Sequence, residues 1–187
     1  MYATDQLRDE HESIQVVLSV LERLSEDLQS KRTINLDHAA GILDFLRTFA
    51  DRCHHGKEED LLFPTLAARG VPVKNGPIGV MLSEHAQGRA YIRAMGEALK
   101  QERAGGNGAR EFAANALGYI ALLRAHIVKE NQVLFPMAER RLTAAEHSHL
   151  ATEFERIEKE RVGPGVHEKY HALISNWRDA YLSATRA

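Results

Sequence analysis

A phrase of eleven residues that occurs twice in this chain constrains both its fold and its chemistry. The first copy, HHGKEEDLLFP, occupies positions 54–64, and the second copy, HIVKENQVLFP, occupies positions 126–136. Each copy places a histidine four residues before a glutamate, His54 before Glu58 and His126 before Glu130. Side chains four residues apart share one face of an α-helix. Each pair can therefore offer two ligands to one metal site.

The composition limits the class of protein. A chain of 187 residues with 44% hydrophobic and 27% charged residues fits one soluble domain with its own core. The formal net charge of -2 includes no basic excess, so we expect neither a nucleic-acid nor a membrane partner. Cys53 is the only cysteine, which excludes an internal disulfide framework, and no apolar leader is visible. These features favour a cytoplasmic protein.

Apolar residues recur at helical spacing in four long segments, and each stripe carries one histidine. The first expected helix runs from a cap at Thr4 or Asp5 to about 29, and the second runs from a polar turn at 30–35 through Thr65. The third begins at Asn75-Gly76-Pro77 and ends at a glycine-rich break at 105–108, and the fourth runs from 109 to about 140. His11 in the first helix corresponds to His85 in the third, so the chain reads as a duplicated helical hairpin. We predict an all-α fold, an up-down-up-down four-helix bundle over residues 1–142.

Two prolines and a C-terminal extension complete the expected architecture. Pro64 and Pro136 end the repeated phrases, where proline removes a backbone hydrogen bond, so we expect a kink at both. A capping box at 143–146 opens a fifth helix to about 161, and after a turn at 162–165 a sixth helix spans about 167–183. The sixth helix has an aromatic stripe that includes Trp177. We assign residues 143–187 to an extension whose stripe packs either on the bundle or at a homodimer interface.

Polar side chains on the inward stripes predict a metal centre. Six residues have this property: His11, His54, Glu58, His85, His126 and Glu130. Imidazoles and carboxylates among aliphatic side chains need compensating charge, which bound cations supply. This donor set suits iron, manganese or zinc, and six ligands suffice for two ions. We expect His11 and His54 to serve one ion and His85 and His126 the other, with the two glutamates bridging them.

The same six residues, together with both Leu-Phe-Pro phrases, resemble the hemerythrin-like HHE cation-binding family over residues 5 to about 140. The resemblance implies a four-helix bundle that holds a non-haem di-iron centre, often oxo- or hydroxo-bridged, and binds or senses dioxygen and related small molecules. Zinc or manganese could substitute for iron. Oxygen-carrying hemerythrins have a third-helix pattern resembling His-x-x-x-His, whereas Arg89 stands four residues after His85 here. The difference leaves either an open coordination position or a substitute ligand, and it disfavours reversible oxygen carriage.

The register of the first pair is ambiguous, because His55 and Glu59 have the same spacing as His54 and Glu58. Aligning the two Leu-Phe-Pro phrases pairs His54 with His126 and leaves Ile127 opposite His55. We therefore predict that His55 and Glu59 lie at the edge of the site or in solvent. The alternative for Glu59 is an extra or substitute carboxylate ligand. Tyr119, two turns before His126, is interpreted as a core residue rather than a ligand.

Three functions follow from this interpretation. The first is a protein that binds or senses dioxygen, nitric oxide or a related ligand at a di-iron centre. The alternative is a di-iron enzyme that acts on peroxide or nitric oxide or repairs damaged iron centres, although the sequence offers no convincing general acid and no nucleophile with a base beside it. Iron storage is the third, and six buried ligands suit it poorly because they hold few ions.

Overall fold

The structure is a computed structural model that describes residues 2–30, 35–161, 163 and 165–183. Regular structure within these residues is helical throughout, and none of them forms a strand, so the all-α prediction is confirmed. No helix in this part of the chain is both long enough and apolar enough to cross a membrane. The predicted turn at 30–35 lies mostly outside the described residues, as do Val162 and Pro164 of the predicted turn at 162–165.

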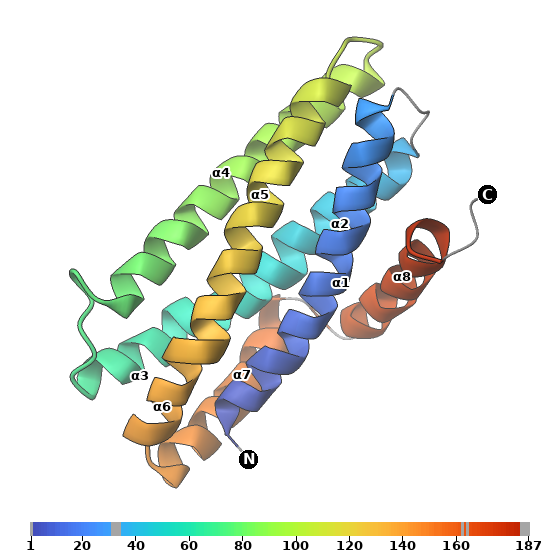
Figure 1. The fold of residues 1–187 in the computed structure, drawn as a ribbon. Coiled ribbons are helices and arrows are strands. Elements are labelled where there is room, and N and C mark those ends of the chain that lie inside the picture. Colours follow the sequence, from blue (N-terminus) through green and yellow to red (C-terminus); the bar gives the residue numbers. More distant parts are fainter. Residues whose placement is uncertain (1, 31–34, 162, 164, 184–187) are drawn as a thin grey trace.

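Four long helical segments lie alongside one another in Figure 1. They are α1 (Ala3–Gln29); α2 (Leu36–Phe45) continued by η1 (Leu46–His55), η2 (Glu58–Leu62) and α3 (Phe63–Ala68); α4 (Pro77–Arg103); and α5 (Ala109–Lys129) continued by η3 (Glu130–Leu134) and α6 (Phe135–Arg141). Gly76 caps α4 and Pro77 is its first residue, as predicted. The predicted cap of α1 is wrong by two residues: Tyr2 is the cap, and its backbone N–H donates to the carboxylate of Asp5 at 2.8 Å.

The repeated phrases pass through π-helical turns. The η2 and η3 segments each precede a Phe-Pro pair, at Pro64 and at Pro136, and an α-helical segment follows both. Proline has no N–H to donate, and its ring crowds the carbonyl four residues earlier. A π turn bonds residues five apart, so it relieves this crowding and changes the face that neighbouring residues present. The helix type thus changes at each proline, and neither proline ends its helix. The expected kink stays a prediction.

Two apolar clusters enclose the inward polar residues. Along α1, Leu7 belongs to the smaller cluster and Ile14 belongs to the larger one, and buried His11 lies between them in sequence. The larger cluster also contains Phe45 and Tyr119, and the smaller one contains Phe135. Apolar packing on both sides removes water from the polar layer, so any charge there requires a partner.

The C-terminal helices α7 (Ala144–Arg161) and α8 (Val166–Tyr181) pack against α1 and its neighbours (Figure 1). The predicted capping box is present: the Thr143 backbone N–H and hydroxyl donate to Glu146 at 2.8 and 2.7 Å. On α8, Trp177 is 2% exposed and belongs to the larger apolar cluster. Its ring lies against Gly41 of α2, where an added Cβ would be 2.9 Å from the indole. The division of the chain at 142 and the homodimer stay predictions.

Candidate metal centre

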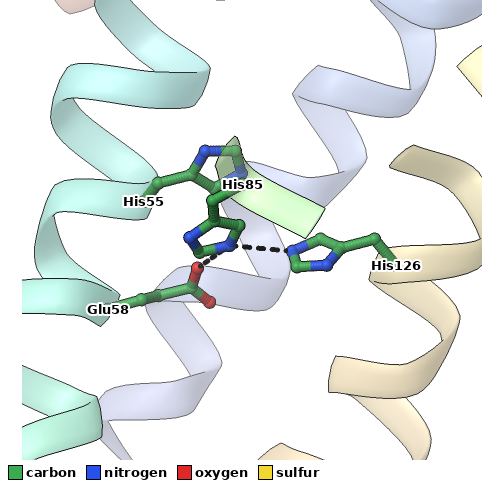
Figure 2. Close-up of side chains that lie close together, drawn as sticks. All are labelled: His55, Glu58, His85 and His126. Carbon is green, nitrogen blue, oxygen red and sulfur yellow. Dashed lines mark hydrogen bonds and ion pairs between the residues drawn. The ribbon is translucent and has the colours of Figure 1, made fainter. Parts of the chain in front are cut away.

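The structure brings all six predicted ligands together between the four long segments. Each is at most 1% exposed: His11 on α1, His54 on η1, Glu58 on η2, His85 on α4, His126 on α5 and Glu130 on η3. They form two groups whose ligand atoms lie within 4.8 Å of one another. The His11 group consists of His11, His54, Glu58 and Glu130, and the His85 group consists of His55, Glu58, His85 and His126 (Figure 2).

Both glutamates span the two groups. The two oxygens of Glu58 lie 3.8 Å from Nε2 of His54 and 3.5 Å from Nε2 of His85. The two oxygens of Glu130 lie 3.3 Å from Nε2 of His11 and 3.2 Å from Nε2 of His126. Each carboxylate therefore offers one oxygen to either side, which is the arrangement of a bridging ligand.

Most inward atoms of the centre lack hydrogen-bond partners; the exceptions are Nε2 of His85 and Nε2 of His126, which lie 3.0 Å apart (Figure 2). Nε2 of His11, His54 and His55 and all four oxygens of Glu58 and Glu130 form no hydrogen bond with any described residue. Buried polar atoms are normally hydrogen-bonded, because an unpaired buried carboxylate is costly. Cations bound between these atoms would satisfy them together, and imidazole with carboxylate is a donor set for iron, manganese or zinc. The residues present thus fit a pair of metal ions.

The pKa values of the two glutamates shift in opposite directions. Burial and the neighbouring charge of Glu130 raise the pKa of Glu58 well above its usual value. Burial also opposes ionisation of Glu130, but the charges of His126 and His11, whose Nε2 atoms lie 3.2 and 3.3 Å from its oxygens, hold its pKa well below the usual range. A cation bound by the two carboxylates would therefore compete with protons at Glu58.

Carboxylates on the first and third long helices orient the histidines of the other two. Nδ1 of His54 lies 2.8 Å from Glu10, and Nδ1 of His126 lies 2.8 Å from Glu84, so each ring N–H donates outward. This arrangement fixes the tautomer and leaves Nε2 free to bind a metal. Sequence reasoning missed both glutamates, although each directly precedes a predicted ligand, His11 or His85.

A lysine completes each of these contacts. Lys57 pairs with Glu10, and Lys129 pairs with Glu84, at equivalent positions of the repeat. Lys57 is fully buried, whereas the side chain of Lys129 is 40% exposed. Glu10 is buried too, yet the hydrogen bond from His54 and the charge of Lys57 lower its pKa to about 2. The repeat thus extends beyond the ligands to the residues that hold them.

The other two predicted histidines are also held through Nδ1. The amide oxygen of Asn131 lies 3.0 Å from Nδ1 of His11, and a carboxylate oxygen of Glu59 lies 2.7 Å from Nδ1 of His85. Glu59 is 22% exposed and belongs to neither group, so its predicted position at the edge is confirmed. Its structural role is to orient His85.

His55 differs from its prediction. It is 3% exposed and belongs to the His85 group, so the expectation of an edge or solvated position is wrong. Its ring stacks on that of His85, with centroids 3.8 Å apart and planes 14° apart. The π-helical η1 segment, in which adjacent His54 and His55 are both buried, accounts for the difference. His55 thus adds a third imidazole to the His85 group, in which Arg89 stands in place of a second third-helix histidine.

Tyr119 lies in the larger apolar cluster with no exposed surface, so its interpretation as a core residue is confirmed. Its ring faces Gly88, where an added Cβ would be 3.5 Å away. Burial raises the pKa of the Tyr119 hydroxyl, which has no hydrogen-bond partner among the described residues. It is a neutral phenol beside the polar layer.

Fold and site together define an all-helical metal-binding protein built on a duplicated helical hairpin. The family model of the hemerythrin HHE cation binding domain matches residues 2–138. The chain belongs to this family. A search of curated proteins and a search of solved structures found no match.

Proposed function

We propose that this protein holds two iron ions and uses them to bind or sense dioxygen, nitric oxide or a related small ligand. The observation that carries the proposal is the buried cluster of imidazole and carboxylate donor atoms from the four long segments, most of which have no hydrogen-bond partner. Imidazole and carboxylate donors accept several metals, and membership of the hemerythrin family favours iron among them.

The chain's own residues divide the work. His11 and His54 would hold one ion, and His55, His85 and His126 the other. Glu58 belongs to both groups, and Glu130 of the His11 group also lies 3.2 Å from Nε2 of His126, so both glutamates would be shared. A bound iron pair would supply redox electrons and a coordination position for a small ligand. The outward hydrogen bonds of the histidines keep Nε2 directed inward, and the apolar clusters exclude water from the centre.

The His11 group provides two imidazoles and the His85 group provides three. With the glutamates shared, the ion held by His11 and His54 has fewer protein ligands. We therefore place the position for the small ligand on that side.

We also propose that the four long segments form an up-down-up-down bundle and that the protein works in the cytoplasm. Family membership and the four adjacent segments in Figure 1 support an up-down-up-down path. Cys53 is a buried free thiol whose pKa burial raises to about 12, which makes it unreactive. An unpaired thiol of this kind supports a cytoplasmic, reducing setting.

The test is a ligand titration of the purified protein after anaerobic iron loading. Absorption spectra are recorded as dioxygen, nitric oxide and peroxide are added to the reduced form, with a His54→Ala/His126→Ala double variant as control. Spectral bands that appear and reverse on ligand removal would support binding. Repeated consumption of peroxide or nitric oxide would favour the enzyme instead. Iron-loaded protein that responds to none of the three would contradict the proposal.

A further inference from the structure

The two halves of the repeat differ at four positions that meet beside the His85 group. Superimposing the halves on their metal-site histidines pairs Asp51 with Leu123, His55 with Ile127, Glu59 with Asn131 and Arg89 with Gln15. The first members of the four pairs form one network of side chains beside the His85 group. The second half therefore contains no counterpart of this network.

Arg89 is the centre of this network. Its Nε donates to Asp51 and its Nη2 donates to Glu59, both at 2.7 Å. The same Asp51 oxygen lies 3.4 Å from Nδ1 of His55, and the same Glu59 oxygen lies 2.7 Å from Nδ1 of His85. A planar guanidinium joins two carboxylates in a fixed geometry, which a lysine cannot reproduce. One side chain of α4 thus reaches both histidines through their acceptors.

The burial of these groups indicates orientation as their role. The side chains of Arg89, Asp51 and Glu59 are 34%, 20% and 22% exposed, whereas the two imidazoles are buried. Partly exposed ion pairs add little to folding stability. Without Arg89, two negative carboxylates would face each other, and Glu59 would be free to rotate away from His85.

We infer that Arg89 is a positioning residue, which holds Asp51 and Glu59 so that Nε2 of His55 and of His85 face one metal ion. Arg89 stands four residues after His85, where the pattern of oxygen-carrying hemerythrins has a second histidine. In this chain Arg89 instead orients His55, the imidazole that replaces that histidine. The inference rests on the proposed two-ion centre and deepens it, because it assigns Arg89 to one ion only.

The test compares three variants of the full chain. Arg89→Met keeps a long side chain but removes both ion pairs, and Arg89→Lys keeps one charge without the fork. Arg93→Met, at an exposed position one turn further along α4, is the matched control. Iron(II) affinity is measured anaerobically against a chelator, Mössbauer spectra distinguish the two iron environments, and thermal melting follows the metal-free protein.

We expect Arg89→Met to lower the binding affinity for one iron ion by about 10–100-fold, while the affinity and the spectrum of the other ion stay unchanged. The iron affinity of Arg89→Lys should lie between those of the wild type and Arg89→Met, and Arg93→Met should bind iron like the wild type. Two ions bound by Arg89→Met with wild-type affinity would overturn the inference. Parallel loss of both ions with a lower melting temperature would also overturn it, because that is the result of a structural role. Failure of the proposed function is distinct, since the wild type itself would then bind no iron, or would bind iron and respond to none of the three small ligands.

Discussion

The imidazole of His55 lies stacked on that of His85, 3.8 Å between ring centroids, although the two residues belong to different halves of the repeat. Both rings are buried, and the unpaired Nε2 of His55 lies within 4.8 Å of the other ligand atoms of the His85 group. The side of the centre where Arg89 stands in place of a second third-helix histidine therefore has three imidazoles.

His55→Ile places the residue of the second half, Ile127, at the first-half position. We expect this variant to lower the binding affinity for one metal ion by about 10–100-fold, which is the range found when groups of a metal site are removed. The metal-free protein should melt no lower than the wild type, because the change removes a buried imidazole nitrogen that has no partner. Metal titration and thermal melting check both points. His149→Ile, at an exposed position, is the control, and unchanged affinity for both ions in His55→Ile would exclude His55 as a ligand.

Glu10→Gln and Glu84→Gln form a matched pair. Both remove an acceptor of a histidine Nδ1–H, so each should weaken metal binding by about 10–100-fold. Only Glu10→Gln takes the main partner from a buried lysine, Lys57, which should lower the metal-free free energy of unfolding by about 2–4 kcal/mol. Glu84→Gln leaves the half-exposed Lys129 and should cost less than about 1 kcal/mol. Urea unfolding measures the difference, and equal losses would show that the burial of Lys57 has no energetic consequence.

Glu146 predicts an acid-sensitive start of α7. Hydrogen bonds from the backbone and side chain of Thr143, then from Arg69, lower its pKa from 4.5 to about 2. A depressed carboxyl pKa stabilises the fold above pH 4.5, and this contribution disappears as the pH falls from 4.5 to about 2. Acid unfolding of Glu146→Gln, compared with the wild type, should lack that part of the pH dependence. Parallel curves for the two proteins between these pH values would contradict the assignment.

Trp177 and Gly41 test whether α8 packs on its own bundle. Trp177→Ala should cost about 3–5 kcal/mol of stability, as expected for a large buried ring. Gly41→Ala should cost about 1–3 kcal/mol, because its Cβ would meet the indole at 2.9 Å. In the Trp177→Ala background the Gly41→Ala change should be stabilising by up to about 1 kcal/mol, since the clash is gone and alanine favours the helix. Urea unfolding measures all three, and additive effects would mean that the two residues do not touch.

Much of the centre could be predicted because it is repeated. The duplicated spacing of His126 and Glu130 identified an inward face, and helical periodicity placed His85 on it. His55 was misplaced because the alignment of the two Leu-Phe-Pro phrases sets Ile127 opposite it. In addition, the π-helical turns break the periodicity of 3.6 residues by which an inward face is recognised. Glu10 was missed for another reason: a Glu-His pair becomes informative only when packing shows which histidine the carboxylate faces.

Elemental analysis of iron bound per chain tests the central claim most directly. Wild-type protein loaded with iron(II) under anaerobic conditions should hold about two ions per chain. The two ligand groups and the two bridging carboxylates supply donors for that number of ions. The His54→Ala/His126→Ala variant removes one imidazole from each group and should retain almost none after gel filtration. A wild-type protein that holds no more metal than this variant would contradict the account.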